Sequence, residues 1–481
     1  MISELFFAAV LTFGGFGSLL FLGIVKTRPE LSVILSLPVG VAVNALMAAA
    51  AYSVALDDPT VPFLATCGLA CLGFLSESQK KLVLKRSLSL LAAALLIVGA
   101  LLYMVRFALS PIMTFDSYKI LLLGNSIGSD SFLIGATGYT NYPLTVLNLQ
   151  AGGSLFEIDY VIFTSTVAGL LAIFASVLLL CQSFWHKKST CAWAVLGACF
   201  ILGIFGGETY MLRSQLVYLN SHLLTAGFFA LGSIFILFPR HELKENRGYL
   251  LTALIIGVVS MTRVEGMLFE ALLLSAYLSR KTFSWRELLQ VGFVTVGIPG
   301  LWYARLAIAG ESDDAILTSK TIVIMMAIIA GPLLLNKVEL MKPFRQRLPL
   351  VVVMGLLGVF WVAMFISDSG VESSMNLLSN AAATGLWGSF WWTFGPLAVA
   401  LAIFGPRLKD ETIWIELLGG ALLLILLLGT VRSTPYRLGW GDSGNRMLVH
   451  IAPLTVLYVC AKIAHSMASW SSVKSTHQIR N

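Results

Sequence analysis

Long apolar segments recur along the whole chain, from Leu5 to His465. Many of them contain enough residues to cross a hydrocarbon core of about 30 Å as a helix. Backbone groups in lipid must find their hydrogen-bond partners within the protein, so these segments are expected to be helical. The alternation of apolar and polar residues that a membrane β-barrel needs is absent. The sequence therefore predicts an all-α integral membrane protein.

Composition and charge agree with this class. Hydrophobic residues make up 57% of the chain and charged residues 12%, about half of the roughly 25% that is usual in soluble domains. The net charge of +7 does not indicate nucleic-acid binding, because the basic residues lie in short loops between apolar segments. The first segment lacks the positive residues of a cleaved signal peptide, so it is expected to remain as a helix.

We expect about 13–15 transmembrane helices. The predicted segments are 4–25, 31–56, 60–77, 87–109, 158–183, 190–206, 216–238, 249–279, 287–309, 321–335, 348–367, 390–405, 413–430 and 448–465. Segment 249–279 is too long for one straight span and would bury Arg263 and Glu265 at its centre. A hairpin of two short helices, with these charges at its turn, keeps all later basic loops on the same side as the earlier ones.

Basic residues predict the orientation. With the N-terminus outside and the C-terminus in the cytoplasm, 22 Lys and Arg residues fall on the cytoplasmic side and 7 on the outer side. Cytoplasmic loops are normally the more basic ones. The cytoplasmic loops are also short, so the working face is expected to be the outer one, in a cell (plasma or inner) membrane. Four regions are expected along the chain: N-terminal helices (1–86), a core with outer loop 110–157 (87–309), further helices (310–465) and a cytoplasmic tail (466–481).

The longest early outer loop carries the first candidate site. Asp116 follows a predicted span, and Lys119, Tyr142 and Pro143 come later in the loop. A proline suits the first turn of a helix, so the loop is expected to form two short helices lying along the membrane surface. A partly desolvated carboxylate there could act as a general base. The alternative is that Asp116 only caps the first short helix.

Two further outer sites pair an acid with an arginine. Glu208 and Arg213 share a short loop and are expected to hold a sugar or phosphate, or else to form a weak surface ion pair. Arg263 and Glu265 interrupt an apolar segment, and charges at that depth are usually functional. The alternative for this second pair is a structural ion pair at the hairpin turn.

The last outer loop collects glycines, aromatic residues, Asp442 and Arg446 before the final span. An arginine there suits a phosphate at the membrane surface, because guanidinium binds phosphate with two parallel hydrogen bonds. The alternative is an interfacial anchor, which is also the interpretation for Arg432 and for the tryptophans Trp387, Trp391 and Trp392. Glu270 and Glu416 fall inside predicted spans and receive no role.

Motifs for other chemistries are missing. The sequence has no P-loop, no HExxH or Cys/His cluster for zinc, and no nucleophile elbow. No cofactor is therefore predicted, and dependence on a divalent metal stays open because no ligand motif supports it.

The chain resembles GT-C fold glycosyltransferases in the order of its candidate residues. These are Asp116 after a span, Tyr142-Pro143 later in the loop, Glu208 in the next outer loop, the Arg263–Glu265 turn and Arg446 before a late helix. The resemblance covers 87–309 and, more loosely, the last span. It departs from the family pattern in three extra N-terminal helices and in Ser117, where many members have a second acid.

This resemblance implies a glycosyltransferase that moves a sugar from a polyprenyl-phosphate donor to the hydroxyl group of a glycan or lipid-linked glycan, with inversion. Asp116, or alternatively Glu208, would be the base. Substrate would contact Lys119, Tyr142, Glu208, Arg213, Arg263, Glu265, Asp442 and Arg446. The rival interpretations are a transporter or flippase of lipid-linked sugars and another membrane-embedded enzyme of polysaccharide assembly.

Overall fold

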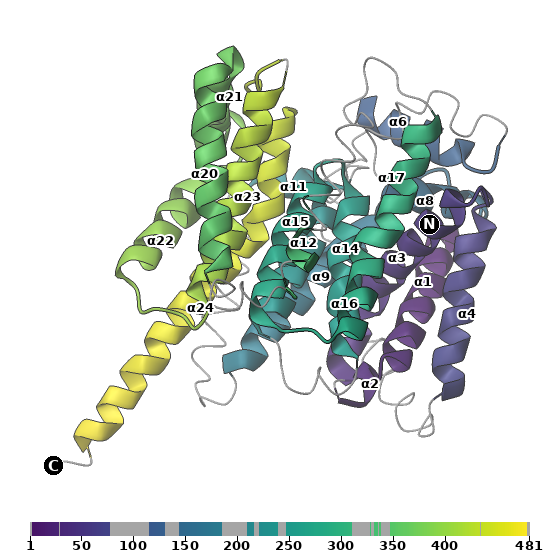
Figure 1. Cartoon of the computed structure of the whole chain (residues 1–481), viewed down its shortest axis with the longest axis horizontal. Coiled ribbons are helices and arrows are strands. Elements are labelled where there is room, and N and C mark those ends of the chain that lie inside the picture. Colours follow the sequence, from purple (N-terminus) through teal and green to yellow (C-terminus); the bar gives the residue numbers. More distant parts are fainter. Residues whose placement is uncertain are drawn as a thin grey trace. The chain divides into compact units, whose positions relative to one another are not determined.

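The structure, a computed structural model, describes residues 2–27, 29–76, 115–129, 144–184, 209–215, 221–238, 247–309, 328, 331–334, 336–337, 347–432 and 434–478. Within these residues the regular structure is entirely helical (Figure 1). Seven helices are long and apolar enough to cross a membrane, and four shorter apolar helices accompany them. The prediction of an all-α, multi-pass membrane protein is confirmed.

Most predicted segments in the described ranges are helices with similar bounds. These are α1 (Ile2–Phe21), α3 (Pro29–Ser53), α4 (Thr60–Ser76), α9 (Ile162–Phe184), α12 (His222–Leu237), α20 (Leu348–Ile366), α22 (Phe390–Phe404) and α23 (Glu411–Val431). The predicted segment 287–309 is a continuous helical stretch made of α16 (Trp285–Gly292), the π-helical turn η2 (Phe293–Gly297) and α17 (Ile298–Ala309). Segments 87–109 and 190–206, and most of 321–335, lie outside the described residues.

The predicted hairpin is also confirmed. Helix α14 (Gly248–Thr262) and helix α15 (Gly266–Arg280) lie side by side in Figure 1, with Arg263, Val264 and Glu265 between them. Each has 15 residues, which at about 1.5 Å per residue gives about 22 Å. That is less than the hydrocarbon thickness of about 30 Å. Each helix alone is therefore shorter than a full membrane span.

The chain divides into two compact units. Unit 1 consists of residues 1–175, 215–232 and 239–346, and unit 2 of 176–214, 233–238 and 347–481. In unit 1, helices α1 and α3 approach closely through Gly15 and Gly40. A Cβ atom on Gly15 would overlap the carbonyl oxygen of Ser36, and one on Gly40 that of Leu11. Small residues commonly permit such contacts between membrane helices.

Two short helices form in the predicted long loop, but one of them is not where it was expected. Helix α6 (Phe115–Ser126) packs against α8 (Leu144–Ser154), as predicted for two short helices. All residues of α8 from Leu144 to Gly153 are buried, so the expectation that it lies along the membrane surface is wrong. Its polar side chains explain this position: the hydroxyl of Tyr52 donates to Asn148 (2.7 Å), and the amide of Asn148 donates to Asn44 (2.5 Å).

In unit 2, two predictions need correction. The predicted loop 367–389 contains helix α21 (Asp368–Ser379) and the π-helical turn η4 (Asn380–Thr384), and α21 packs against α23. The predicted last span 448–465 is part of a longer helix, α24 (Ser443–Gln478), which continues without interruption into the predicted tail. The polar residues of α21 did not indicate a helix, because helix formation there depends on packing against α23.

Candidate functional site: the hairpin turn of unit 1

The turn between α14 and α15 holds an ion pair. The Nε atom of Arg263 donates to Glu265 Oε1 at 2.6 Å, and the two side chains are 19% and 7% exposed. Glu265 precedes α15 but its carboxylate makes no capping bond to the helix. The pair thus interrupts an apolar segment without capping the helix, which favours a functional role over a purely structural one.

Two other helices of unit 1 begin at this turn. At the start of α8, the hydroxyl of Thr145 donates to the carbonyl of Met261 at 2.7 Å. In the first turn of α12, the hydroxyl of Thr225 lies 2.9 Å from that of Thr262. The first turns of α8 and α12, which follow segments predicted to lie on the outer side, therefore lie beside the turn between α14 and α15.

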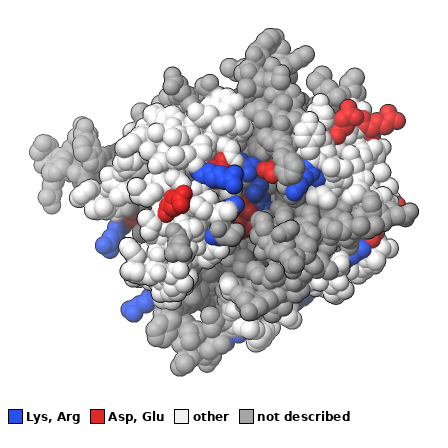
Figure 2. Space-filling model, turned by 90° about the horizontal axis from the view of Figure 1, so that it is seen from above, with Lys and Arg blue, Asp and Glu red and all other residues white. Residues whose placement is uncertain are grey.

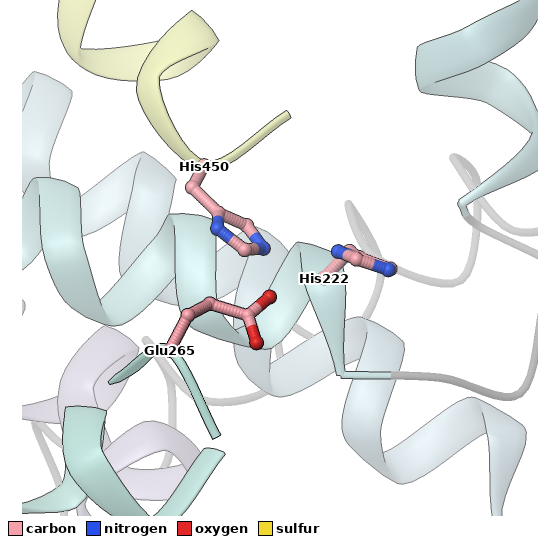
Figure 3. Close-up of side chains that lie close together, drawn as sticks. All are labelled: His222, Glu265 and His450. Carbon is pink, nitrogen blue, oxygen red and sulfur yellow. The ribbon is translucent and has the colours of Figure 1, made fainter. Parts of the chain in front are cut away.

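His222 is the second titratable group beside the turn. It is the first residue of α12 and is fully buried. One of its ring nitrogens and a carboxylate oxygen of Glu265 lie within 4.8 Å of each other, and Figure 3 shows the carboxylate directed toward the ring. His450, which Figure 3 also labels, belongs to unit 2. His222 and Glu265 together can bind a cation or hold the hydroxyl groups of a ligand.

We call the residues Thr145, His222, Thr225, Arg263 and Glu265 the hairpin site. Helices α8, α12 and α15 all start here, whereas only α14 ends here. The first N–H groups of a helix lack partners within the helix and carry a partial positive charge, so they attract anions. With Arg263 beside them, the site is suited to a negatively charged group such as a phosphate.

The start of α12 adds a polar group that is not used within the described protein. Ser221 occupies the position before the helix, where its carbonyl accepts the bond from Thr225 N–H at 2.8 Å. Its hydroxyl is fully buried and has no hydrogen-bond partner in the described part of the chain. A serine at this position normally caps the helix through its hydroxyl. Here that hydroxyl is available to a ligand.

The candidate base lies in the same unit. Asp116 is half-buried in the first turn of α6, so the expectation that it is the cap residue itself is not met. A carboxylate in the first turn of a helix is stabilised in its charged form by the helix dipole, as a general base requires. Lys119 is half-buried one turn further along. Tyr142 lies outside the described residues, directly before α8.

Several predicted ligands belong to unit 2. Asp442 caps α24: its carboxylate accepts from the N–H groups of Gly444 (2.8 Å), Asn445 (3.2 Å) and Arg437 (2.9 Å). These bonds give Asp442 a structural role at the start of α24, and its contact with substrate stays a prediction. Arg446, four residues further on, is half-buried. Arg213 belongs to the short helix α11 (Tyr210–Ser214), but its side chain and all of Glu208 lie outside what the structure describes.

The tryptophans of unit 2 also differ from prediction. Trp387 is 1% exposed and donates its indole N–H to Asn445 at 2.6 Å. It is therefore a core residue, whereas Trp392 is exposed. In the same region, Met211 N–H donates to Leu386 carbonyl at 3.0 Å, and the ring of Tyr210 contacts that of Trp440. The predicted outer segments 206–215, 367–389 and 431–447 therefore meet within unit 2.

Figure 2 shows mostly uncharged residues over the described part of the surface, with a few Lys, Arg, Asp and Glu side chains among them. This fits a membrane protein in which the few charged residues are retained for specific contacts.

Three residues beside the hairpin escaped the sequence analysis. His222 and Tyr303 follow no motif, and both fall inside predicted spans, 216–238 and 287–309, so no sequence signal marked them. Glu270 received no role, yet it is fully buried. Its position inside an apolar segment was the signal, because buried acids in membrane helices are rare. Comparison of the chain with protein-family models, curated proteins and solved structures gives no match.

Proposed function

We propose that the protein is a membrane glycosyltransferase, which moves a sugar from a polyprenyl-phosphate-linked donor to the hydroxyl group of a glycan or lipid-linked glycan. The observation that carries this proposal is the hairpin site. The first turns of α8 and α12 hydrogen-bond to the last residues of α14, next to Arg263 and the start of α15, and helix N-termini and an arginine both attract a phosphate. A phosphate attached to a polyprenyl chain can reach this site from the bilayer without leaving it.

Each residue then has a chemical role. Asp116 takes the proton from the acceptor hydroxyl while that oxygen attacks the anomeric carbon, and the bond to the lipid phosphate breaks. A single displacement of this kind inverts the anomeric centre. The negative charge that grows on the departing phosphate is stabilised by Arg263 and the helix N-termini, where preorganised positive charge lowers the barrier most. Glu265 and His222 orient sugar hydroxyls, and Lys119, Tyr142, Glu208, Arg213 and Arg446 complete the binding surface.

The proposal includes a GT-C-like architecture of about 13–15 transmembrane helices, with the hairpin site facing the outside of a cell membrane. It is supported by the grouping of chain segments. Within each unit, segments assigned to the outer face by their charges lie together. Two segments assigned to the cytoplasmic side also meet in unit 1, where the side-chain amide of Asn336 donates to the carbonyls of Leu278 (3.0 Å) and Lys281 (3.1 Å).

Sugar transfer by the purified protein in lipid nanodiscs tests the proposal. Labelled polyprenyl-phosphate sugars, hexoses and pentoses, are offered with and without a divalent cation, and released polyprenyl phosphate is measured. We expect release with at least one donor, and a loss of at least 100-fold in Asp116→Asn, since a positioned base contributes about 10²–10⁴-fold. Asp159→Asn is the control, because Asp159 is an exposed acid shortly after the end of the predicted loop 110–157. Full activity in folded Asp116→Asn would remove the base assignment.

A transporter or flippase of lipid-linked sugars is the second candidate. The interrupted segment 249–279 and the buried Glu270 favour it, because broken helices and buried acids also mark transport sites. Movement of a labelled lipid-linked sugar across the bilayer of proteoliposomes, without release of polyprenyl phosphate, would support this function instead.

A further inference from the structure

Glu270 is the one acid beside the hairpin that the proposed chemistry does not use. It lies on α15, five residues after Glu265. Its side chain is fully buried, and neither carboxylate oxygen has a hydrogen-bond partner in the described residues. An ionised carboxylate in this setting would be very costly, because burying an unpaired charge costs far more than burying a neutral acid.

The hydroxyl groups near Glu270 favour its protonated form over its ionised form. Ser260 of α14 uses its hydrogen on the carbonyl of Gly257 at 2.8 Å. Tyr303 of α17 uses its hydrogen on the carbonyl of Ser260 at 2.7 Å. Ser260 is the side chain next to the Glu270 carboxyl group. While the hydrogen of Ser260 stays on Gly257, its hydroxyl group offers Glu270 only lone pairs, and a carboxyl group can donate to them only when it is protonated.

Other charged groups around Glu270 do not compensate an ionised form. Helix α14 contributes no charged residue, and the only other titratable group on it, Tyr249, lies at its opposite end. On α17, Arg305 is paired with Asp57, with 2.7 Å between its second guanidinium nitrogen and the carboxylate. Helix α12 meets α15 through the rings of Phe229 and Phe269. Its titratable residue, His222, lies at the turn beside Glu265.

We propose that Glu270 is a proton-binding site: the carboxyl group carries a proton inside unit 1 at neutral pH and exchanges it through Tyr303 toward the hairpin turn. Tyr303 is suited to this path because its phenol group donates to the carbonyl of Ser260 at 2.7 Å, and Ser260 lies between Glu270 and the end of α14 at the turn. A proton is the ligand that fits, since it needs one oxygen atom and no cavity. The proposal does not depend on sugar transfer, and it concerns a residue to which that reaction gives no role.

A hydrophobic carbodiimide tests whether Glu270 is protonated. Dicyclohexylcarbodiimide reacts with protonated carboxyl groups in apolar surroundings: the acid proton moves to a nitrogen of the reagent and the carboxyl oxygen bonds to its central carbon. A shift of the acyl group to nitrogen gives a stable adduct that keeps all atoms of both reactants. Peptide mass spectrometry then finds the modified residue.

At neutral pH we expect the adduct on Glu270 in the wild-type protein and no adduct at this position in Glu270→Gln. Glu411 is the internal comparison, because it is ion-paired with Lys462 and should stay unmodified. Glu265→Gln should still be modified at Glu270. An unmodified Glu270 in folded protein, under conditions that modify a membrane-buried acid in another protein, would overturn the proposal.

Infrared spectroscopy tests the same claim without a reagent, and also the path. The wild-type protein should show the C=O stretch of a protonated carboxylic acid, and Glu270→Gln should lack it. Exchange into heavy water should shift the band at least tenfold more slowly in Tyr303→Phe than in Tyr277→Phe, the matched control at the other end of α15. If the band persists in Glu270→Gln, the proton-binding site is refuted, and equal exchange rates in the two tyrosine variants would refute the path.

Discussion

The ion pair at the hairpin turn allows a quantitative test. Arg263 and Glu265 are separated by 2.6 Å between Nε and Oε1 and are largely buried. At an effective dielectric constant of about 20, unit charges about 4 Å apart attract by about 4 kcal/mol. Desolvation offsets part of this. Removing one partner of a buried pair leaves the other charge unpaired and typically costs about 3–5 kcal/mol.

We therefore expect Arg263→Gln and Glu265→Gln each to lower the free energy of unfolding by about 3 kcal/mol. The double variant should lose clearly less than the sum, so that the coupling energy is about 2 kcal/mol. Unfolding in mixed micelles, followed by tryptophan fluorescence at increasing denaturing detergent, measures all four proteins.

The pair Lys281–Glu287 is the control for this cycle. Its atoms are as close, at 2.7 Å, but the side chains are 25% and 27% exposed at the start of α16. Exposed pairs contribute at most about 1 kcal/mol, so the same cycle should give a coupling below that of the hairpin pair. Additive effects of Arg263→Gln and Glu265→Gln would refute the reasoning, because they would mean that each charge is separately solvated.

Three further predictions concern packing and capping. Gly40→Leu should greatly reduce the folded, monodisperse fraction in size-exclusion chromatography, because the new side chain would meet the backbone of α1. Gly355→Leu is the control and should not reduce this fraction, since Gly355 has open space around it. Equal folded fractions in the two variants would contradict the prediction. Asp442→Ala should lower the free energy of unfolding by about 1 kcal/mol through the lost cap, whereas Asp442→Asn should stay close to wild type in thermal unfolding. An unchanged stability in Asp442→Ala would contradict the capping role. Trp387→Phe should cost about 1–3 kcal/mol in the same measurement, since Asn445 loses its indole donor, and no change would place Trp387 outside the core.

The sequence was sufficient for the parts of the fold that depend on lipid. Apolar length predicted the spans. The basic residues on the two sides of 249–279 predicted the hairpin, because a single helix with Arg263 and Glu265 at its centre would have placed all later basic loops on the opposite side of the membrane. Local patterns were insufficient where tertiary contacts decide. The polar residues of α21 are typical of a loop, and only the contact with α23 explains why they form a helix. The burial of α8 depends on Asn44 and Tyr52, which are distant in the sequence.

The candidate site was also predicted only in part. The charged turn was found because charge inside an apolar segment is conspicuous. His222 and Tyr303 were not found, because each becomes relevant only when its helix is placed beside the turn. Asp442 was assigned to substrate because an acid in a glycine-rich loop suggests binding, whereas its three backbone bonds show that it ends the loop and starts α24.

Preferential binding of a lipid phosphate tests the central claim most directly. Binding of polyprenyl phosphate and of the corresponding uncharged polyprenol is measured with the wild-type protein, with Arg263→Gln/Glu265→Gln and with the control Arg432→Gln, which alters an exposed residue. Wild type and control should prefer the phosphate, and the double variant should lose this preference at least tenfold, equivalent to about 1.4 kcal/mol. An unchanged preference in the folded double variant would contradict the assignment of the hairpin site to a lipid phosphate.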